Sequence, residues 1–187
     1  MKNMKFIFKL AAILFLIAFI CSLLLVLCNT LTKDRILELQ QKAENEARIE
    51  VLADASDFEK LHSSDKVDEA YIGKDSNGDT AGYCFKVSPS GFNGKITMIV
   101  GITKDGVISG VKITDMAETP GLGAKSTDEA WTAQFKGKTD KIEVVKTGNA
   151  KGNQINAISG ATITSRAVAE GVNIALGEAQ TLIKEGK

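Results

Sequence analysis

A run of small and hydroxylated residues near the C-terminus is the part of the sequence best suited to chemistry. It reads Ser159-Gly160-Ala161-Thr162-Ile163-Thr164, between an expected strand at residues 155–158 and an expected helix from Thr164 to about Lys184. Glycine permits backbone conformations closed to other residues, and alanine leaves room for a bulky anion to approach. From about Ile163 onward, the first amides of that helix would offer unpaired N–H groups to the anion. The run is therefore typical of a phosphate-binding turn.

Composition alone favours a simpler interpretation of the same run. Small hydroxylated residues are common at helix starts, so Ser159 and Thr164 would then be capping residues and nothing more. A second segment, Glu118-Thr119-Pro120-Gly121-Leu122-Gly123-Ala124, has the composition of an ordinary Pro-Gly turn. Neither segment decides its own role in isolation.

The N-terminal residues predict a membrane anchor. Residues 10–28 carry no charged side chain, and Ser22 is the one clearly polar residue among them. A helix rises about 1.5 Å per residue, so this segment would span roughly 30 Å, the thickness of the hydrocarbon core of a bilayer. Because the segment ends without a small-x-small cleavage site, we expect the anchor to be retained.

Charge around the span predicts its orientation. Lys2, Lys5 and Lys9 lie just before it, which favours a cytoplasmic N-terminus and an extracytoplasmic main domain. The chain has 23 basic and 23 acidic residues, so the part outside the tail is slightly acidic. No basic patch indicates nucleic acid as a partner.

Cysteine and histidine usage excludes several classes of site. Cys21 and Cys28 lie in the span, where they are expected to be small apolar residues, and Cys84 alone belongs to the rest of the chain. No disulfide can therefore form within that part. His62, the single histidine, has no metal-ligand pattern around it and is expected at the surface. A hydrolytic triad has no support.

Turn signals and β-branched runs predict the fold. Strands are expected at residues 81–87, 95–102 and 107–114, and Asp105-Gly106 indicates a hairpin between the last two. A short helix is expected at residues 126–134, with Trp131 and Phe135 in the core, followed by a strand at 141–146. The closing helix has apolar residues at core-facing spacing, namely Val168, Val172, Ala175, Leu176 and Ile183.

These elements define an α+β domain, an antiparallel sheet with packed helices, behind a single transmembrane helix. Residues 33–52 contain many helix formers and no Gly or Pro, so the membrane helix is expected to continue as a polar stalk. The expected organisation is a cytoplasmic tail at 1–9, a transmembrane helix at 10–28, a helical stalk or linker at 29–65 and a soluble domain at 66–187.

The two turn segments together resemble a known family. The run S-G-A-T-x-T-S, preceded some forty residues upstream by E-T-P-G-L-G, is similar to the FMN-binding domain of RnfG, a component of Rnf electron transport complexes, and of its relative NqrC in the Na⁺-translocating NADH:quinone reductase. The single span, the stalk, the stretch around Trp131 and the final helix occur in the same order. One position departs from the family pattern, which often has Asp where this chain has Asn156.

The resemblance implies a role for each segment. FMN is expected on Thr162 through a phosphoester bond, installed by a separate flavin transferase that uses FAD and Mg²⁺. Ser159, Gly160, Ala161 and Thr164 would complete the cofactor-binding turn, with Thr164 as the nearby hydroxyl that competes for the assignment. In the second segment, Glu118 or Thr119 would reach ribityl or ring polar atoms, Leu122 would cover the ring, and Gly123 would permit the tight turn.

The implied function is electron transfer within an ion-translocating Rnf-type ferredoxin:NAD⁺ oxidoreductase complex, with other integral and peripheral subunits as partners. The chain alone would not catalyse the overall reaction. Two alternatives stay open: an NqrC component of a Na⁺-translocating NADH:quinone reductase or a stand-alone flavinylated carrier, and a membrane-anchored interaction module without redox function.

Overall fold

The computed structural model describes residues 2–61, 64–146 and 148–186, with side chains from residue 4 onward. The chain forms two units, residues 1–42 and residues 43–187. The first unit contains most of helix α1, Lys2–Val51, which is continuous through the predicted span. Among the described residues, α1 is the one helix long and apolar enough to cross a membrane. Its apolar side chains between residues 10 and 28 are exposed.

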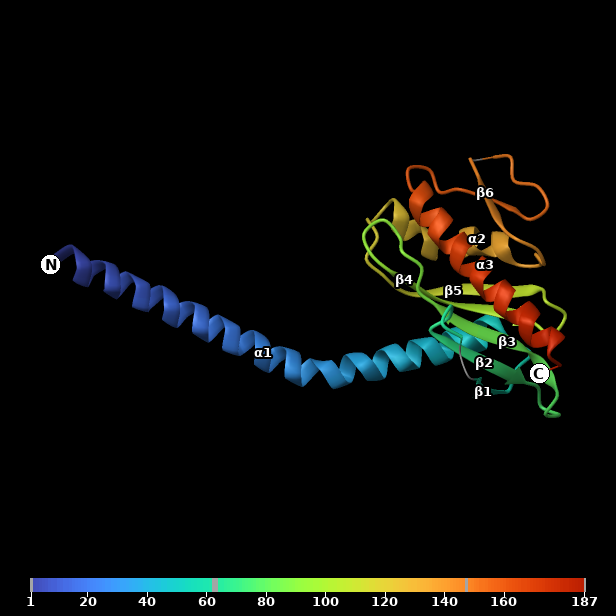
Figure 1. The fold of residues 1–187 in the computed structure, drawn as a ribbon, viewed down its shortest axis with the longest axis horizontal. Coiled ribbons are helices and arrows are strands. Elements are labelled where there is room, and N and C mark those ends of the chain that lie inside the picture. Colours follow the sequence, from blue (N-terminus) through green and yellow to red (C-terminus); the bar gives the residue numbers. More distant parts are fainter. Residues whose placement is uncertain (1, 62–63, 147, 187) are drawn as a thin grey trace. The chain divides into compact units, whose positions relative to one another are not determined.

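The second unit is built on a five-stranded antiparallel meander in the order β1-β2-β3-β4-β5 (Figure 1). Its strands are β1 Asp57–Leu61, β2 Glu69–Lys74, β3 Thr80–Val87, β4 Ile96–Thr103 and β5 Ile108–Met116. The three predicted strands are β3, β4 and β5, and the predicted hairpin joins β4 to β5 at Gly106, where φ is +78°. Glycine suits this turn because a positive φ is strained for other residues.

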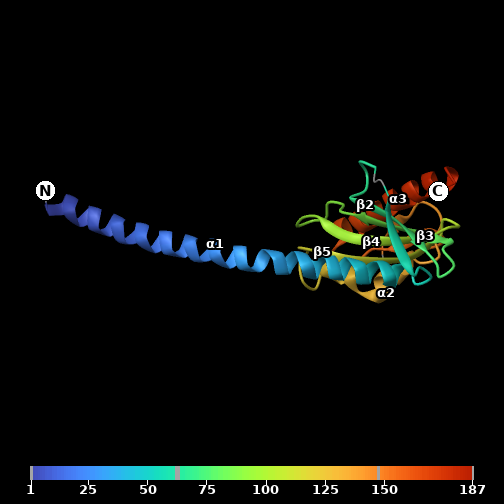
Figure 2. The same cartoon turned by 90° about the horizontal axis from the view of Figure 1, so that it is seen from below.

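Both faces of the sheet are covered. Met98, Val100 and Ile102 of β4 face the main core with residues of helix α3, Thr162–Lys184, whereas Ile99 faces a second cluster with the end of α1. Successive side chains of a strand point to opposite faces, so these two sets separate cleanly. Figure 2 shows the sheet between the C-terminal end of α1 and α3.

The last turns of α1 lie on a surface made flat by glycine. Ala47, Val51 and Leu52 pack against Cys84 and Ile99 of the sheet. A Cβ at Gly101 would lie 2.5 Å from the carbonyl oxygen of Val51, and one at Gly110 would lie 3.2 Å from its Cα. The hydroxyl of Ser109 donates a hydrogen bond to the same carbonyl, which satisfies an acceptor at the helix end.

This packing changes the expected domain boundary. The sequence predicts a stalk or linker at residues 29–65, yet residues 43–52 pack on the sheet and residues 57–61 form its edge strand β1. The polar pattern of residues 33–52 correctly predicts a continued helix. It does not reveal that the helix ends against the domain, because the contacts are made with residues far along the chain.

The remaining elements lie between β5 and α3. The predicted helix at 126–134 is three short turns: η1 Gly123–Thr127, α2 Glu129–Thr132 and η2 Ala133–Phe135. The predicted strands at 141–146 and 155–158 are β6 Glu143–Val145 and β7 Gln154–Asn156, which pair with each other in parallel and not with the main sheet. The α+β architecture is confirmed, with α3 beginning two residues earlier than expected.

Candidate functional site

Two hydrogen bonds of Ser165, a residue without a predicted role, stabilise the turn from β7 into α3. The Ser165 hydroxyl donates to the carbonyl of Ala161 at 2.9 Å and accepts the N–H of Ile158 at 3.0 Å. Gly160 lies between them with φ of +77°, a conformation that favours glycine. Ser165 is fully buried and fixes the shape of the turn.

The simpler interpretation of this turn as a pair of caps is wrong. Ala161 occupies the N-cap position of α3, and no side chain caps the helix there. The first backbone bond of the helix runs from the N–H of Ser165 to the carbonyl of Ala161 at 3.0 Å. The N–H groups of residues 162–164 precede that bond and have no partner within the helix.

The two threonines of the run differ sharply in accessibility. Thr162 is exposed, whereas Thr164 is 1% exposed and donates its hydroxyl to Glu118 Oε2 at 2.7 Å. A hydroxyl must be reachable to be modified by another protein. Of the two threonines, Thr162 is therefore the one that the fold exposes. Ser159 is also exposed, but it does not line the pocket described below.

The two predicted segments line one pocket. Its volume of about 370 Å³ is in the size range of small-molecule sites. Eight of the nine predicted site residues line it; Ser159 does not, and the structure adds Phe92 and Ile163. The predicted lining residues are Glu118, Thr119, Leu122, Gly123, Gly160, Ala161, Thr162 and Thr164. Phe92 carried no local signal in the sequence, because it comes from the loop before β4.

Glu118 joins three segments of the pocket wall. Its Oε1 accepts the N–H groups of Phe92 at 2.8 Å and Asn93 at 3.0 Å, while its Oε2 accepts the hydroxyl of Thr164. Burial alone would raise the pKa of this carboxyl, but the three donated hydrogen bonds outweigh it and hold the pKa below its ordinary value. Both oxygens of Glu118 therefore bond to protein groups, while the residue also lines the pocket.

Apolar side chains gather around this pocket and are exposed. Phe92 is 67%, Leu122 45% and Ile163 54% exposed. Among the described residues of the second unit, the other large apolar side chain exposed to this degree is Ile49, on α1. Single exposed apolar residues are ordinary, but three from separate segments around one pocket indicate a binding site.

The residues of this pocket fit FMN. Exposed apolar side chains suit a flat aromatic ring system, and unpaired amides at a helix start suit a phosphate. Leu122 lies over the turn, because a Cβ at Gly160 would be 3.1 Å from its Cδ2. A side chain at residue 160 would therefore crowd Leu122.

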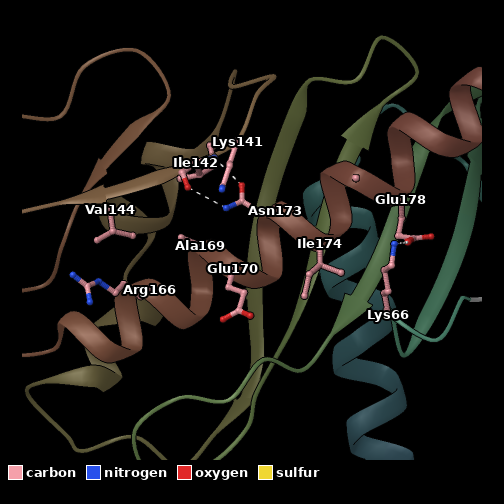
Figure 3. Close-up of a pocket in the computed structure, with 11 residues that line it drawn as sticks. Lys66, Lys141, Ile142, Val144, Arg166, Ala169, Glu170, Asn173, Ile174 and Glu178 are labelled. Atoms are coloured by element: carbon pink, nitrogen blue, oxygen red, sulfur yellow. Dashed lines mark hydrogen bonds and ion pairs between the residues drawn. The ribbon is translucent and has the colours of Figure 1, made fainter.

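A larger groove runs along α3, apart from the predicted site residues (Figure 3). Its volume is about 580 Å³, and Asn173 ties its wall to α3 by accepting the N–H of Ile142 at 2.7 Å and donating to its carbonyl at 3.0 Å. Lys66 and Glu178 form an ion pair of 3.7 Å at one end. These hydrogen bonds connect α3 to the segment before β6 at the groove.

The other residues discussed from sequence have structural places. Phe135 is fully buried, and Trp131 packs edge-on against it with ring centroids 5.4 Å apart, as expected of core residues. Burial raises the pKa of Cys84 to about 12, so this thiol is not a reactive group. No metal-binding cluster occurs among the described residues. His62 lies outside them.

Comparisons with known proteins agree with this geometry. A family model described as the FMN-binding domain matches residues 91–177, and one described as the RnfG N-terminal region matches residues 1–51. Two solved structures share the fold. One is the NqrC protein of Shewanella oneidensis, with a TM-score of 0.56, 24% identity and 71% of each chain covered. The other is the corresponding component of the Na⁺-translocating NADH-quinone reductase of Parabacteroides distasonis, with a TM-score of 0.62 and 20% identity, covering 80% of this chain and 96% of that one.

Sequence relatives identify the family. The chain is 42% identical to the RnfG-type component of the Na⁺-translocating ferredoxin:NAD⁺ oxidoreductase complex of Acetobacterium woodii, covering 96% of this chain and 95% of that protein. It is 35% identical to the same component of the ion-translocating oxidoreductase complex of Methanosarcina acetivorans, covering 94% and 96%. Both matches extend over the anchor and the domain. The chain therefore belongs to the RnfG family of ion-translocating oxidoreductase complexes.

Proposed function

We propose that this chain is a membrane-anchored electron-transfer subunit of an ion-translocating ferredoxin:NAD⁺ oxidoreductase complex and that it carries one FMN on Thr162 through a phosphoester. The observation that carries this proposal is an exposed hydroxyl at a helix start, beside a pocket with exposed apolar side chains, in a chain similar to RnfG proteins over nearly its full length. The cofactor supplies the redox chemistry when bound.

Thr162 provides the attachment point. Its hydroxyl oxygen would form a new bond to the phosphorus of the FMN half of FAD while the pyrophosphate bond breaks, with AMP as the leaving group and loss of the hydroxyl proton. A threonine hydroxyl is a weak nucleophile without an activating base. Among the described pocket residues, Glu118 is the carboxylate, and its oxygens are engaged elsewhere. A separate flavin transferase with Mg²⁺ would therefore supply activation.

The remaining pocket residues hold and shield the cofactor. The N–H groups of residues 162–164, which have no partner within the helix, would stabilise a phosphate on Thr162. Leu122, Phe92 and Ile163 would cover the flavin ring and exclude water from it. A covalent tether keeps the cofactor at a permanently high local concentration, which matters where a dissociated cofactor would be lost.

Intact-mass measurement tests the attachment. The chain produced together with its transferase is expected to gain the mass of FMN less one water, and Thr162→Ala should abolish the gain. Thr164→Ala is the matched control and should keep it. An adduct that survives Thr162→Ala and disappears in Thr164→Ala would contradict the residue assignment, whereas unmodified, colourless native protein would contradict the function.

Partners and orientation follow from the same proposal. Purification from native membranes should recover subunits that carry iron–sulfur clusters and oxidise ferredoxin; a quinone-reducing assembly would contradict the assignment.

The domain is expected outside the cytoplasmic membrane, because Lys2, Lys5 and Lys9 precede the span. A cysteine introduced at the exposed Ser76 should react with an impermeant maleimide in intact cells. Labelling only after lysis would reverse the orientation.

A further inference from the structure

Glu118 holds a negative charge inside the wall of the flavin pocket. Its side chain is 8% exposed and lines the pocket, although both of its oxygens accept hydrogen bonds from protein groups. The donors come from the loop before β4 and from the first turn of α3. The carboxylate is thus the point at which three separate segments meet.

The backbone leaves space for this carboxylate at two glycines. A Cβ at Gly91 would lie 2.5 Å from Oε1, and one at Gly123 would lie 2.5 Å from Oε2. Any side chain at either position would displace the carboxylate or the loop. The two glycines therefore leave room for the side-chain oxygens of residue 118.

Hydrogen bonding by itself does not require a charge here. A glutamine at this position could accept both backbone N–H groups with Oε1 and donate from Nε2 to the Thr164 oxygen. The charge is the property that distinguishes the native residue from its amide. A buried charge acts strongly on its neighbours, because the protein interior screens it less than water does.

We propose that Glu118 is a positioning residue for the pocket and that its charge lowers the reduction potential of the flavin held there. The inference rests on the proposed function. Reduction adds negative charge to a bound flavin, and a fixed carboxylate in the pocket wall disfavours that change by Coulomb repulsion. The lowered pKa of Glu118 keeps the carboxylate ionised throughout the neutral range.

Two isosteric variants are expected to shift the potential in opposite directions. Glu118→Gln removes the charge and keeps the hydrogen bonds, so the midpoint potential should become more positive at a pH where reduction leaves added negative charge on the flavin. Thr164→Val keeps the charge but removes one donor that stabilises it, so the potential should become slightly more negative. A purely structural disturbance has no reason to produce opposite signs.

The experiment uses the full flavinylated chain in detergent, with the potential measured by spectroelectrochemical titration and the flavin content by absorbance and intact mass. Opposite shifts in the two variants support the proposal, and Glu118→Asp, which keeps the charge, should stay closer to the native potential than Glu118→Gln. A flavinylated Glu118→Gln chain with the native potential overturns it. If Glu118→Gln loses its flavin, the midpoint potential of the flavinylated Thr164→Val chain tests the proposal instead. A potential equal to or more positive than that of the native chain then overturns it.

Flavin content separates this inference from the proposed function. A native chain without any flavin on Thr162 contradicts the function itself. If the native chain is flavinylated but its midpoint potential equals that of Glu118→Gln, only the inference is contradicted. A readout without the cofactor also exists: in the Thr162→Ala chain, the pH dependence of unfolding should change when Glu118→Gln is added, since the ionisable group is then missing.

Discussion

Two regions of the domain use the same apolar residue types for opposite purposes. Where α1 meets the sheet, Leu52 is 1% exposed and packs against Cys84 and Ile99. In the pocket next to the start of α3, Leu122 from the loop after β5 is 45% exposed, and Phe92 and Ile163 line the same pocket. Folding alone accounts for the first cluster, because burial of apolar surface stabilises the domain. Folding does not account for the exposed cluster at the pocket, which indicates that a bound ligand covers these side chains.

The largest expected contrast comes from matched leucine substitutions. Leu52→Ala should destabilise the chain by about 2–5 kcal/mol, because it removes buried methyl groups and leaves a cavity. Leu122→Ala should change stability by less than about 0.5 kcal/mol, as is usual for exposed positions. Urea unfolding of the chain in detergent, followed by tryptophan fluorescence, measures both.

The pocket leucine should matter for the cofactor instead. If Leu122 covers the flavin that we propose on Thr162, its removal should make the flavin fluorescence easier to quench with iodide. Leu52→Ala should leave quenching unchanged in the folded chain. A Leu122→Ala variant that is strongly destabilised without flavin would break the comparison, because the exposed cluster would then serve folding.

A glycine pair sharpens the same contrast at the α1 contact. Gly101→Ala would push a Cβ to within 2.5 Å of the Val51 carbonyl oxygen, so we expect a loss of about 1–3 kcal/mol from overpacking. Gly177 lies inside α3 with no atom within 4 Å of its would-be Cβ. Gly177→Ala should therefore stabilise the chain by about 0.5–1 kcal/mol through helix propensity.

Thermal or urea unfolding of the two alanine variants is the measurement. Equal effects at residues 101 and 177 would mean that the end of α1 is not seated on the sheet in solution. Hydrogen exchange offers an independent check, because the amides of residues 43–52 should be protected in the native chain and lose protection in Gly101→Ala.

The pH dependence of stability provides a smaller signal from the pocket side. The pKa of Glu118 is lowered in the folded chain, so the folded state binds its proton less readily than the unfolded state does. Its contribution is fully present above the ordinary value of 4.5 and is lost as the pH falls through the lowered folded pKa. Glu118→Gln should show a weaker loss of stability over that acid range; an unchanged profile would contradict the hydrogen-bonded carboxylate.

Local patterns in the sequence predicted much of the fold for physical reasons. Strand alternation and the Asp105-Gly106 turn are set by neighbouring residues, so β3, β4 and β5 were predicted with near-correct bounds. The apolar spacing of α3 likewise follows from its own helix, and Val168, Val172, Ala175 and Leu176 are buried as predicted. The seat of α1 could not be predicted this way, because Gly101 and Gly110 acquire meaning only against Val51.

In the site too, features set by neighbouring residues were predicted and contacts between distant residues were not. Each turn segment by itself has the composition of an ordinary cap or turn, so the roles of the two were predicted from their joint resemblance to a family; the structure brings them together in one pocket. The partnership of Glu118 with Thr164 spans 46 residues and overrides the local preference of a threonine for a helix cap. Phe92 was missed because a lone aromatic residue in a Gly-rich loop has no periodicity to reveal it.

The smallest expected effect concerns the one departure from the family pattern, Asn156. Its Oδ1 accepts the N–H groups of Gly148 at 2.8 Å and Ala150 at 3.3 Å, and so organises the loop after β6, outside the pocket lining. A carboxylate can accept the same two hydrogen bonds. Asn156→Asp should therefore change stability by less than about 0.5 kcal/mol. Intact mass should show the FMN adduct retained; a folded Asn156→Asp chain without it would mean that the transferase contacts this side chain, and the site would extend beyond the pocket.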